Sequence, residues 1–253
     1  MSDKLIFVGT AGGRASVFRR IRRSGGFLLR LSDLWIHTDP GPGAFVYLHD
    51  MGFDPRNLDC VVLSHIHLDH SSDINSVIES ATDGGKKRDL VLFAPLSALE
   101  GENRVVLPFI RRERIAKEFI LEEGKEYEYK GLSIKAVMKH KHHHTETYAI
   151  LYNRRILYVS CALYEDRMLE VYPKNLDLII INTTLYEKKK YIEHLTVQDA
   201  KKILSHLKPK HAILTHFGYE VLLNYSLEDI AVEVTKETGV ETICAYDGME
   251  VEL

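Results

Sequence analysis

The sequence predicts an α/β fold, and two observations predict it. Short apolar runs of strand length recur along the chain, and amphipathic segments of helix length lie between them. Strands and helices intermixed in this way pack as layers of helix on sheet. The chain has 253 residues, enough to bury a large core, and no Pro-, Gly- or Ser-rich linker divides it. We therefore expect one domain over residues 1–253.

The expected elements follow from apolar runs and from their period. The expected strands are Lys4–Val8, Gly26–Arg30, Trp35–Thr38, Cys60–Ser64, Leu90–Ala94, Leu132–Met138, Tyr148–Tyr152, Arg155–Val159, Leu178–Ile181, Ala212–Thr215 and Glu241–Ala245. Apolar spacings of three and four predict helices over Asp73–Ala81, Val197–Leu207 and Leu227–Glu237. Thr196 is the expected N-cap of the second helix, and Ser72 or Asp73 can cap the first. The charged segment Leu107–Lys125 is expected to bridge the two halves with a solvated surface.

Composition and charge give no support to membrane or polyanion binding. The net charge is −3, and no apolar stretch approaches the roughly 20 residues that cross a bilayer. The opening MSDKLIFVGTAGG is typical of a first strand and turn rather than a signal peptide. The cysteines Cys60, Cys161 and Cys244 are odd in number and far apart, which favours a reducing compartment. We expect a cytoplasmic protein without a membrane partner.

The densest group of metal-binding residue types follows the expected strand Cys60–Ser64. Four candidate ligands occur within six positions of the run SHIHLDH, and they are His65, His67, Asp69 and His70. Imidazole nitrogen and carboxylate oxygen are donors that Zn²⁺ and its first-row neighbours accept. The carboxyl end of a strand is also where α/β sheets bind ligands. The pattern therefore predicts a metal site at this end of the sheet.

This run resembles the HxHxDH signature of the metallo-β-lactamase superfamily, and the likeness extends over nearly the whole chain. FVGTAGG resembles the opening of the tRNase Z and phosphodiesterase branch, HTDPGPGA its second motif and LTHFG its last motif. The resemblance implies a four-layer αβ/βα sandwich. It also implies that Asp39 supports the ligands from behind and that His216 is itself a ligand.

The resemblance implies a further histidine ligand in the run HKHHHT that follows Leu132–Met138. The family spacing places this histidine four residues before a Ser or Thr that opens the next strand. Thr147 therefore selects His143, with His144 as the alternative, and the remaining histidines are expected at the surface or beside the ligands.

At the place of the family's bridging Asp this chain has Cys161. We favour a thiolate ligand, because thiolate binds zinc well and true metallo-β-lactamases often carry Cys there. The alternatives are a buried core Cys with a weakened second site, or a different alignment. The implied ligands are then His65, His67 and His143 for one metal, and Asp69, His70, Cys161 and His216 for the other. We expect two Zn²⁺ per chain, with Mn²⁺ or Fe as alternatives.

Two such metals can activate one water and hold the oxygens of an electrophile. Asp69 can orient that water and accept its proton. His194, in EHLT, resembles the histidine that the phosphodiesterase branch uses as general acid; the alternative is a surface histidine near a helix start. The arginines of the N-terminal segment can bind phosphate or form a solvated basic loop, and they are Arg14, Arg19, Arg20, Arg22 and Arg23.

These features predict a metal-dependent hydrolase, a phosphodiesterase first of all. The long arm that grips tRNA in the family is missing from the sequence, so a small or short single-stranded phosphodiester, RNA or a cyclic nucleotide, is the expected substrate. Hydrolysis of a thioester, lactone or ester at the same site is the alternative, because fold alone does not decide. A non-catalytic metal-binding sensor is the non-enzyme alternative. A homodimer is an expectation of the resemblance alone.

Overall fold

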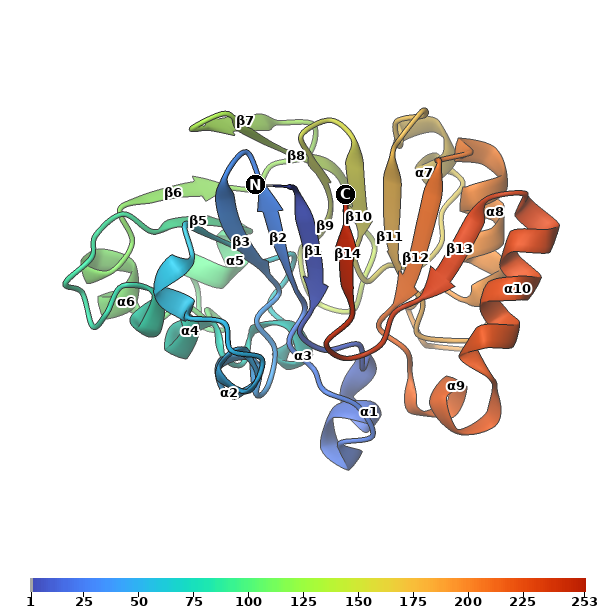
Figure 1. Ribbon diagram of the computed structural model, residues 1–253, viewed down its shortest axis with the longest axis horizontal. Helices are drawn as coiled ribbons and strands as arrows, with labels where there is room; N and C mark the ends of the chain where they lie inside the picture. The colour runs from blue at the N-terminus through green and yellow to red at the C-terminus, as the bar shows by residue number, and fades with distance from the viewer. Residues whose placement is uncertain (1) are drawn as a thin grey trace.

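A computed structural model describes residues 2–253 and confirms the expected fold class. Two seven-stranded mixed sheets lie face to face, and helices cover the outer face of each sheet (Figure 1). The four layers are thus helix, sheet, sheet and helix. Helices α2, α4 and α6 lie outside the first sheet, and α7, α8 and α10 lie outside the second.

The two sheets repeat one pattern of strand directions. The first sheet has the order β14-β1-β2-β3-β4-β5-β6, antiparallel as far as β3 and parallel from β3 to β6. The second has the order β7-β8-β9-β10-β11-β12-β13, antiparallel as far as β10 and parallel from β10 to β13. The two sheets are therefore a structural repeat that is not visible as a repeat in the sequence.

The strand bounds are β1 Lys4–Phe7, β2 Phe27–Leu31, β3 Leu34–Thr38, β4 Cys60–Val62, β5 Val91–Ala94, β6 Lys117–Ile120, β7 Glu126–Tyr129, β8 Leu132–His140, β9 Thr147–Tyr152, β10 Ile156–Val159, β11 Leu178–Asn182, β12 His211–Thr215, β13 Glu241–Cys244 and β14 Glu250–Glu252. The helix bounds are α1 Gly13–Arg19, α2 Ala44–Asp50, α3 Leu68–Ser71, α4 Ile74–Ala81, α5 Leu96–Leu99, α6 Pro108–Glu113, α7 Arg167–Val171, α8 Val197–Leu207, α9 Tyr219–Asn224 and α10 Leu227–Thr238, with a 3₁₀ turn at Pro55–Asn57.

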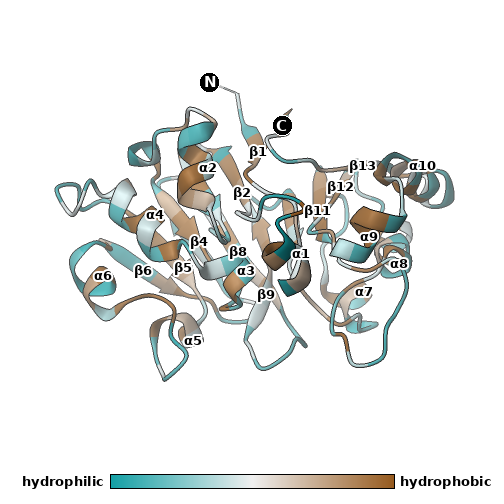
Figure 2. Cartoon of the chain, turned by 90° about the horizontal axis from the view of Figure 1, so that it is seen from below, coloured by the Kyte–Doolittle hydropathy of each residue, from teal (hydrophilic) through white to brown (hydrophobic). Residues whose placement is uncertain are grey.

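The core consists of three apolar clusters that follow the layers. One cluster lies between the sheets and includes Phe7, Phe93 and Tyr152, all fully buried. A second joins the outer face of the second sheet to α7, α8 and α10, and the third joins the first sheet to α2 and α4. Figure 2 shows the same arrangement as apolar strands inside and polar loops outside. Burial on both faces explains why the central strands are almost continuously apolar.

Every strand expected from an apolar run is present, and so are the three expected helices. Thr196 caps α8 with a complete capping box, in which its hydroxyl accepts from the Asp199 amide. The side chain of Asp73 does not cap α4; its carboxylate instead accepts from the amide of Phe45. The strands β6, β7 and β14 were not expected, nor were the short helices α1, α2, α3, α5, α6, α7 and α9, because these segments are short or carry no clear period.

The segment Leu107–Lys125 contains α6 and β6, an edge strand of the first sheet, and leads to β7 of the second sheet. Its charges are not simply solvated, since Arg111 pairs with Glu118 and Arg114 pairs with Glu79. Within residues 2–253 the structure has no helix that is long and apolar enough to cross a membrane.

Candidate metal centre

Candidate ligands from both sheets meet at one end of the sandwich. His65 to His70 follow β4, His142 lies between β8 and β9, Cys161 follows β10 and His216 follows β12. Their donor atoms form two groups, in each of which all the atoms lie within 4.8 Å of one another. The first group is His65, His142 and Cys161, and the second is His70, Cys161 and His216.

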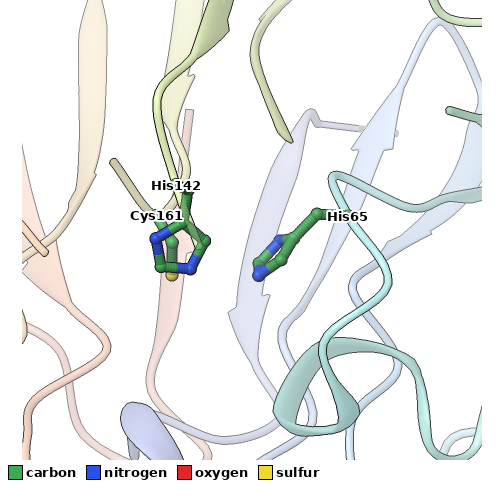
Figure 3. Close-up of side chains that lie close together, drawn as sticks. All are labelled: His65, His142 and Cys161. Atoms are coloured by element: carbon green, nitrogen blue, oxygen red, sulfur yellow. The ribbon is translucent and has the colours of Figure 1, made fainter. Parts of the chain in front are cut away.

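His65 is the member of the first group that comes from the first sheet. Its Nδ1 is 3.0 Å from the hydroxyl of Ser64, while its buried Nε2 has no hydrogen-bond partner among the described residues. Figure 3 shows the side chains of His142 and Cys161 facing the His65 ring. His67 lies beside this group, with its Nδ1 3.1 Å from Nε2 of His142.

The second group is assembled around the ring of His70. Its Nε2 lies 2.9 Å from Nε2 of His216 and 3.4 Å from Sγ of Cys161. One carboxylate oxygen of Asp69 lies 3.7 Å from the same His70 nitrogen and 3.4 Å from Nε2 of His216. The Asp69 oxygen also accepts from the amide of Gly13 at 3.0 Å, which fixes the carboxylate.

The structure corrects the histidine expected after β8. His142, and not His143, points into the first group, and Nδ1 of His142 bonds the Glu193 carbonyl at 2.6 Å. The side chain of His143 is 58% exposed and stacks on His144, while only its backbone carbonyl touches His67. The reason is the strand period: Lys139 and Lys141 point outward, so His140 and His142 point inward.

His140 is buried beside the site without joining either group. Its Nε2 lies 2.6 Å from the hydroxyl of Tyr172, and its Nδ1 lies 3.3 Å from the Cys161 carbonyl. Burial lowers the pKa of His140 to about 4, so the ring is neutral and can bridge these two groups. It therefore fixes the backbone at Cys161.

Cys161 belongs to both groups, which is the arrangement expected of a bridging position. Its side chain is buried, and burial alone would raise the pKa of the thiol. The neighbouring rings of His216 and His70 outweigh burial and hold that pKa well below its usual value. The thiolate is the form that binds metal.

The electrostatics of the histidines differ between the groups. Burial lowers the pKa of His65 to about 4 and that of His142 to about 3, so both are neutral. Burial would also lower the pKa of His70 and of His216. Cys161 and Asp69 outweigh burial there, so that the pKa of His70 is raised and the pKa of His216 rises to about 9. Without metal, protons on His70 and His216 therefore balance the negative charges of Cys161 and Asp69.

Asp39 fixes the second group from behind. Its carboxylate lies 2.9 Å from Nδ1 of His70, and it accepts from the amide and hydroxyl of Ser64 and from the hydroxyl of Tyr158. Burial would raise the pKa of Asp39, but His70 outweighs that effect and keeps the pKa lowered. A carboxylate with this many donors orients the His70 ring, so that Nε2 faces the second group.

Asp39 (φ 55°) and His216 (φ 60°), both part of the site, have left-handed backbone conformations although neither is glycine. Such conformations cost about 1–3 kcal/mol each and persist where the surroundings impose them. Gly12 shows how tightly these surroundings fit, because a Cβ there would lie 2.1 Å from Nδ1 of His216. The GTAGG segment thus needs glycine for a close approach to a candidate ligand.

His194 lies half-buried between the two groups. Its ring centroid is 4.9 Å from that of His142 and 5.8 Å from that of His216. The hydroxyl of Thr184 lies 3.2 Å from Nδ1 of His194 and 2.9 Å from Nδ1 of His216. A single hydroxyl thus links this histidine to a candidate ligand.

The N-terminal arginines divide into two sets. Arg22 bonds the Thr10 hydroxyl and the Ala245 carbonyl, and Arg23 stacks on Tyr47 at 4.8 Å. The exposed arginines are those of α1 and its end, Arg14, Arg19 and Arg20. Figure 2 shows α1 between α3 and α9. The first residue of α1, Gly13, contacts the candidate ligand Asp69.

Sequence reasoning missed Asn182 and Thr184, which contact the candidate ligands Cys161 and His216, and it missed Tyr158, which contacts Asp39. Asn182 and Thr184 follow directly on the apolar run of β11. The position at the carboxyl end of a parallel strand was therefore an available signal. Tyr158 gave no comparable signal, because its hydroxyl is found only by its contact with Asp39.

Comparisons with known proteins show the family of this chain. A profile of the beta-lactamase superfamily domain matches residues 34–217. An uncharacterized protein of Methanocaldococcus jannaschii is 28% identical, with 100% of this chain and 96% of that protein covered.

Two solved structures share the fold over their full lengths. The metallo-β-lactamase fold protein YhfI from Bacillus subtilis has a TM-score of 0.81 at 20% identity, with all of both chains covered. The short form of human tRNase Z has a TM-score of 0.72 at 16% identity, with 98% of each chain covered. At these identities the likenesses show the shared fold. The chain belongs to the beta-lactamase superfamily and has the metallo-β-lactamase fold.

Proposed function

We propose that this metallo-β-lactamase-fold hydrolase is a phosphodiesterase that acts on a small or short single-stranded phosphodiester. One observation carries the proposal: two groups of buried nitrogen and sulfur donors share Cys161, with the half-buried His194 beside both. Such a site has ligands for two metals and a separate group for proton delivery.

The residues present fit divalent metal ions. The buried Nε2 of His65 has no partner among the described residues, and burial of such an atom is costly unless a donor or a metal satisfies it. His65, His67 and His142 would hold one ion, and Asp69, His70, Cys161 and His216 would hold the other, with Cys161 within reach of both. Zn²⁺ suits this mixture of nitrogen, oxygen and sulfur donors. Bound ions would supply Lewis acidity and lower the pKa of a water molecule.

Asp69 would orient the attacking water. Its carboxylate is held by the Gly13 amide, and the charge of His70 and the hydrogen bond of His216 outweigh burial and hold its pKa well below the usual value. A group with so low a pKa stays ionised. Asp69 would therefore accept a hydrogen bond from the attacking water and would not become protonated itself.

His194 would protonate the leaving oxygen. It does not belong to either donor group, and the Thr184 hydroxyl contacts its Nδ1. We assign proton delivery to its other ring nitrogen, Nε2. General acid catalysis by a positioned histidine is worth about 10²–10⁴-fold. The connection that leads to His194 also carries the exposed Lys188 and Lys190, which can attract an anionic substrate.

The exposed arginines support a phosphate-containing substrate. Arg14 and Arg20 lie at the two ends of α1, whose first amide group contacts Asp69. Guanidinium groups match phosphate oxygens in geometry and charge. The fold shared with the short form of human tRNase Z supports the same substrate class. The sequence has no long arm of the kind that grips tRNA in the family, which favours a shorter substrate.

The experiment is hydrolysis of bis(p-nitrophenyl) phosphate by the zinc-loaded protein, beside a panel of thioesters, lactones and neutral esters. We expect turnover of the phosphodiester that chelation abolishes and zinc restores. Turnover of thioesters or lactones alone would move the substrate class to carboxylic esters. Metal binding without any turnover would identify a sensor.

A further inference from the structure

We propose that Asn182 is a positioning residue that donates a hydrogen bond to the Cys161 thiolate and so tunes Cys161 as a metal ligand. The inference rests on the proposed function, in which Cys161 holds metal. The amide nitrogen of Asn182 lies 3.5 Å from Sγ of Cys161 and 3.0 Å from the hydroxyl of Tyr158. All three side chains are buried.

The direction of these hydrogen bonds is fixed at Asp39. The ionised Asp39 carboxylate only accepts, so the single hydroxyl hydrogen of Tyr158 is donated to it at 2.8 Å. The Tyr158 oxygen can then only accept, which requires an N–H of Asn182 to face it. The second N–H of the same amide nitrogen is directed at Cys161, which therefore receives a hydrogen bond.

Asn182 is held in place by the strands on either side of β11. β11 pairs in parallel with β10 on one side and with β12 on the other, and Asn182 is opposite Thr215. Cys161 follows β10 and His216 follows β12. Asn182 thus lies between two candidate ligands, on a rigid central strand.

A hydrogen bond to a metal-bound thiolate has a defined chemical effect. It withdraws electron density from sulfur, which weakens sulfur-to-metal donation and preserves the Lewis acidity of the ion. A thiolate at a bridging position would otherwise neutralise more of the metal charge than a carboxylate does. The hydrogen bond from Asn182 offsets this loss of metal charge. Tyr158 fixes the orientation of the Asn182 amide through its own bond to Asp39, the carboxylate that also orients His70.

The test is the sulfur-to-cobalt charge-transfer band of the cobalt-substituted protein. The variants are Asn182→Leu, which has a similar shape without the donor, and Tyr158→Phe, which frees the amide to rotate. We expect the band to move to longer wavelength in Asn182→Leu and to move less, in the same direction, in Tyr158→Phe. The double variant should match Asn182→Leu, because both changes break one chain of hydrogen bonds.

The matched control is Thr242→Val, which alters a buried threonine in β13 whose hydroxyl, among the described residues, bonds only the Val240 carbonyl. The control should leave the band unmoved. A band that stays unmoved in folded Asn182→Leu and in Tyr158→Phe would overturn the inference while leaving Cys161 a ligand. A parent protein without any such band would overturn the thiolate ligand itself, and the role of Asn182 with it. Circular dichroism identifies a variant that fails to fold, in which case Tyr158→Phe decides.

Discussion

In the first sheet one short run after β4 carries four candidate ligands, whereas the second sheet distributes its candidates over three separate connections. His65, His67, Asp69 and His70 are within six positions of one another. His142, Cys161 and His216 are far apart in the chain and meet only when β8 to β12 have assembled. The two sheets have the same order of strand directions, so the difference lies in the connections and not in the architecture.

The comparison shows which half of the site depends on tertiary structure. Local sequence brings the first set to one strand end, and Asp39 on the neighbouring strand end orients it. The second set needs the correct register of a whole sheet. Changes in the second half should therefore affect the site through folding as well as through direct coordination.

The largest expected effect separates His142 from its neighbour. His142→Ala should lower zinc affinity and turnover by more than the roughly 10–100-fold that loss of a supporting partner costs, as should His65→Ala. His143→Ala is the matched control, since its exposed ring stays outside both groups. Metal content and bis(p-nitrophenyl) phosphate turnover measure the effect. Loss of metal in His143→Ala with retention in His142→Ala would contradict the arrangement.

The histidine run shows where sequence reasoning stopped. Counting back from Thr147 selected His143, because family spacing treats the connection between β8 and β9 as fixed. The alternation of outward Lys139 and Lys141 would have selected His140 and His142 as inward residues, had the strand been extended beyond Met138. The side on which a loop residue emerges depends on where the strand ends, and apolar periodicity does not define that end in a run of polar residues.

The next effect concerns proton delivery. His194→Ala should reduce phosphodiester turnover by about 10²–10⁴-fold with an alkyl leaving group, and less with nitrophenol, which leaves without a proton. Metal content should stay unchanged. Equal losses with good and poor leaving groups would contradict the assignment of His194 as general acid.

A smaller effect is expected from Thr184→Val, which keeps the shape of the residue and removes the hydroxyl shared by His194 and His216. Loss of one such hydrogen bond costs about 1 kcal/mol, or about fivefold in turnover. The loss should again be larger with the poor leaving group. An identical loss on both leaving groups would indicate that Thr184 acts through the metal ligand His216 alone.

The pH dependence of metal affinity provides a test of the second group. The pKa of His216 is raised to about 9, mainly by Cys161 acting against burial, so without metal the ring is protonated at pH 7. Metal must displace this proton, so affinity should rise as pH increases from 6 toward 9, by about tenfold per unit for each proton released. Competitive zinc titration measures the slope. A flat profile would show that metal displaces no proton.

The smallest effects concern the N-terminal arginines. Arg14→Ala with Arg20→Ala should raise KM for phosphodiesters severalfold and leave KM for neutral esters unchanged, because both side chains are exposed. Arg22→Ala should instead lower the free energy of unfolding by about 1–3 kcal/mol, since its guanidinium bonds Thr10 and Ala245. Kinetics on both substrate types and urea unfolding distinguish the two sets.

Most of the fold could be predicted from the sequence, because strands that are buried on both faces have nearly continuous apolar sequences. β6, β7 and β14 could not, since they lie at or near sheet edges and are half polar. In the site, Asp39 and the run after β4 were predictable from motifs. Tyr158 and Asn182 were not, because a buried hydrogen-bond chain joins residues on different strands and leaves no spacing in the sequence.

The most direct test of the account is a titration of the metal-free protein with cobalt, followed by absorption in the near ultraviolet and compared with Cys161→Ser. We expect two equivalents to bind per chain and a sulfur-to-cobalt band to appear in the parent and vanish in Cys161→Ser. That result would place Cys161 at the junction of the two donor groups, where both sheets contribute to one centre. Binding of one equivalent without a sulfur band, unchanged in Cys161→Ser, would contradict the two-metal centre and leave only the ligands that follow β4 with His142.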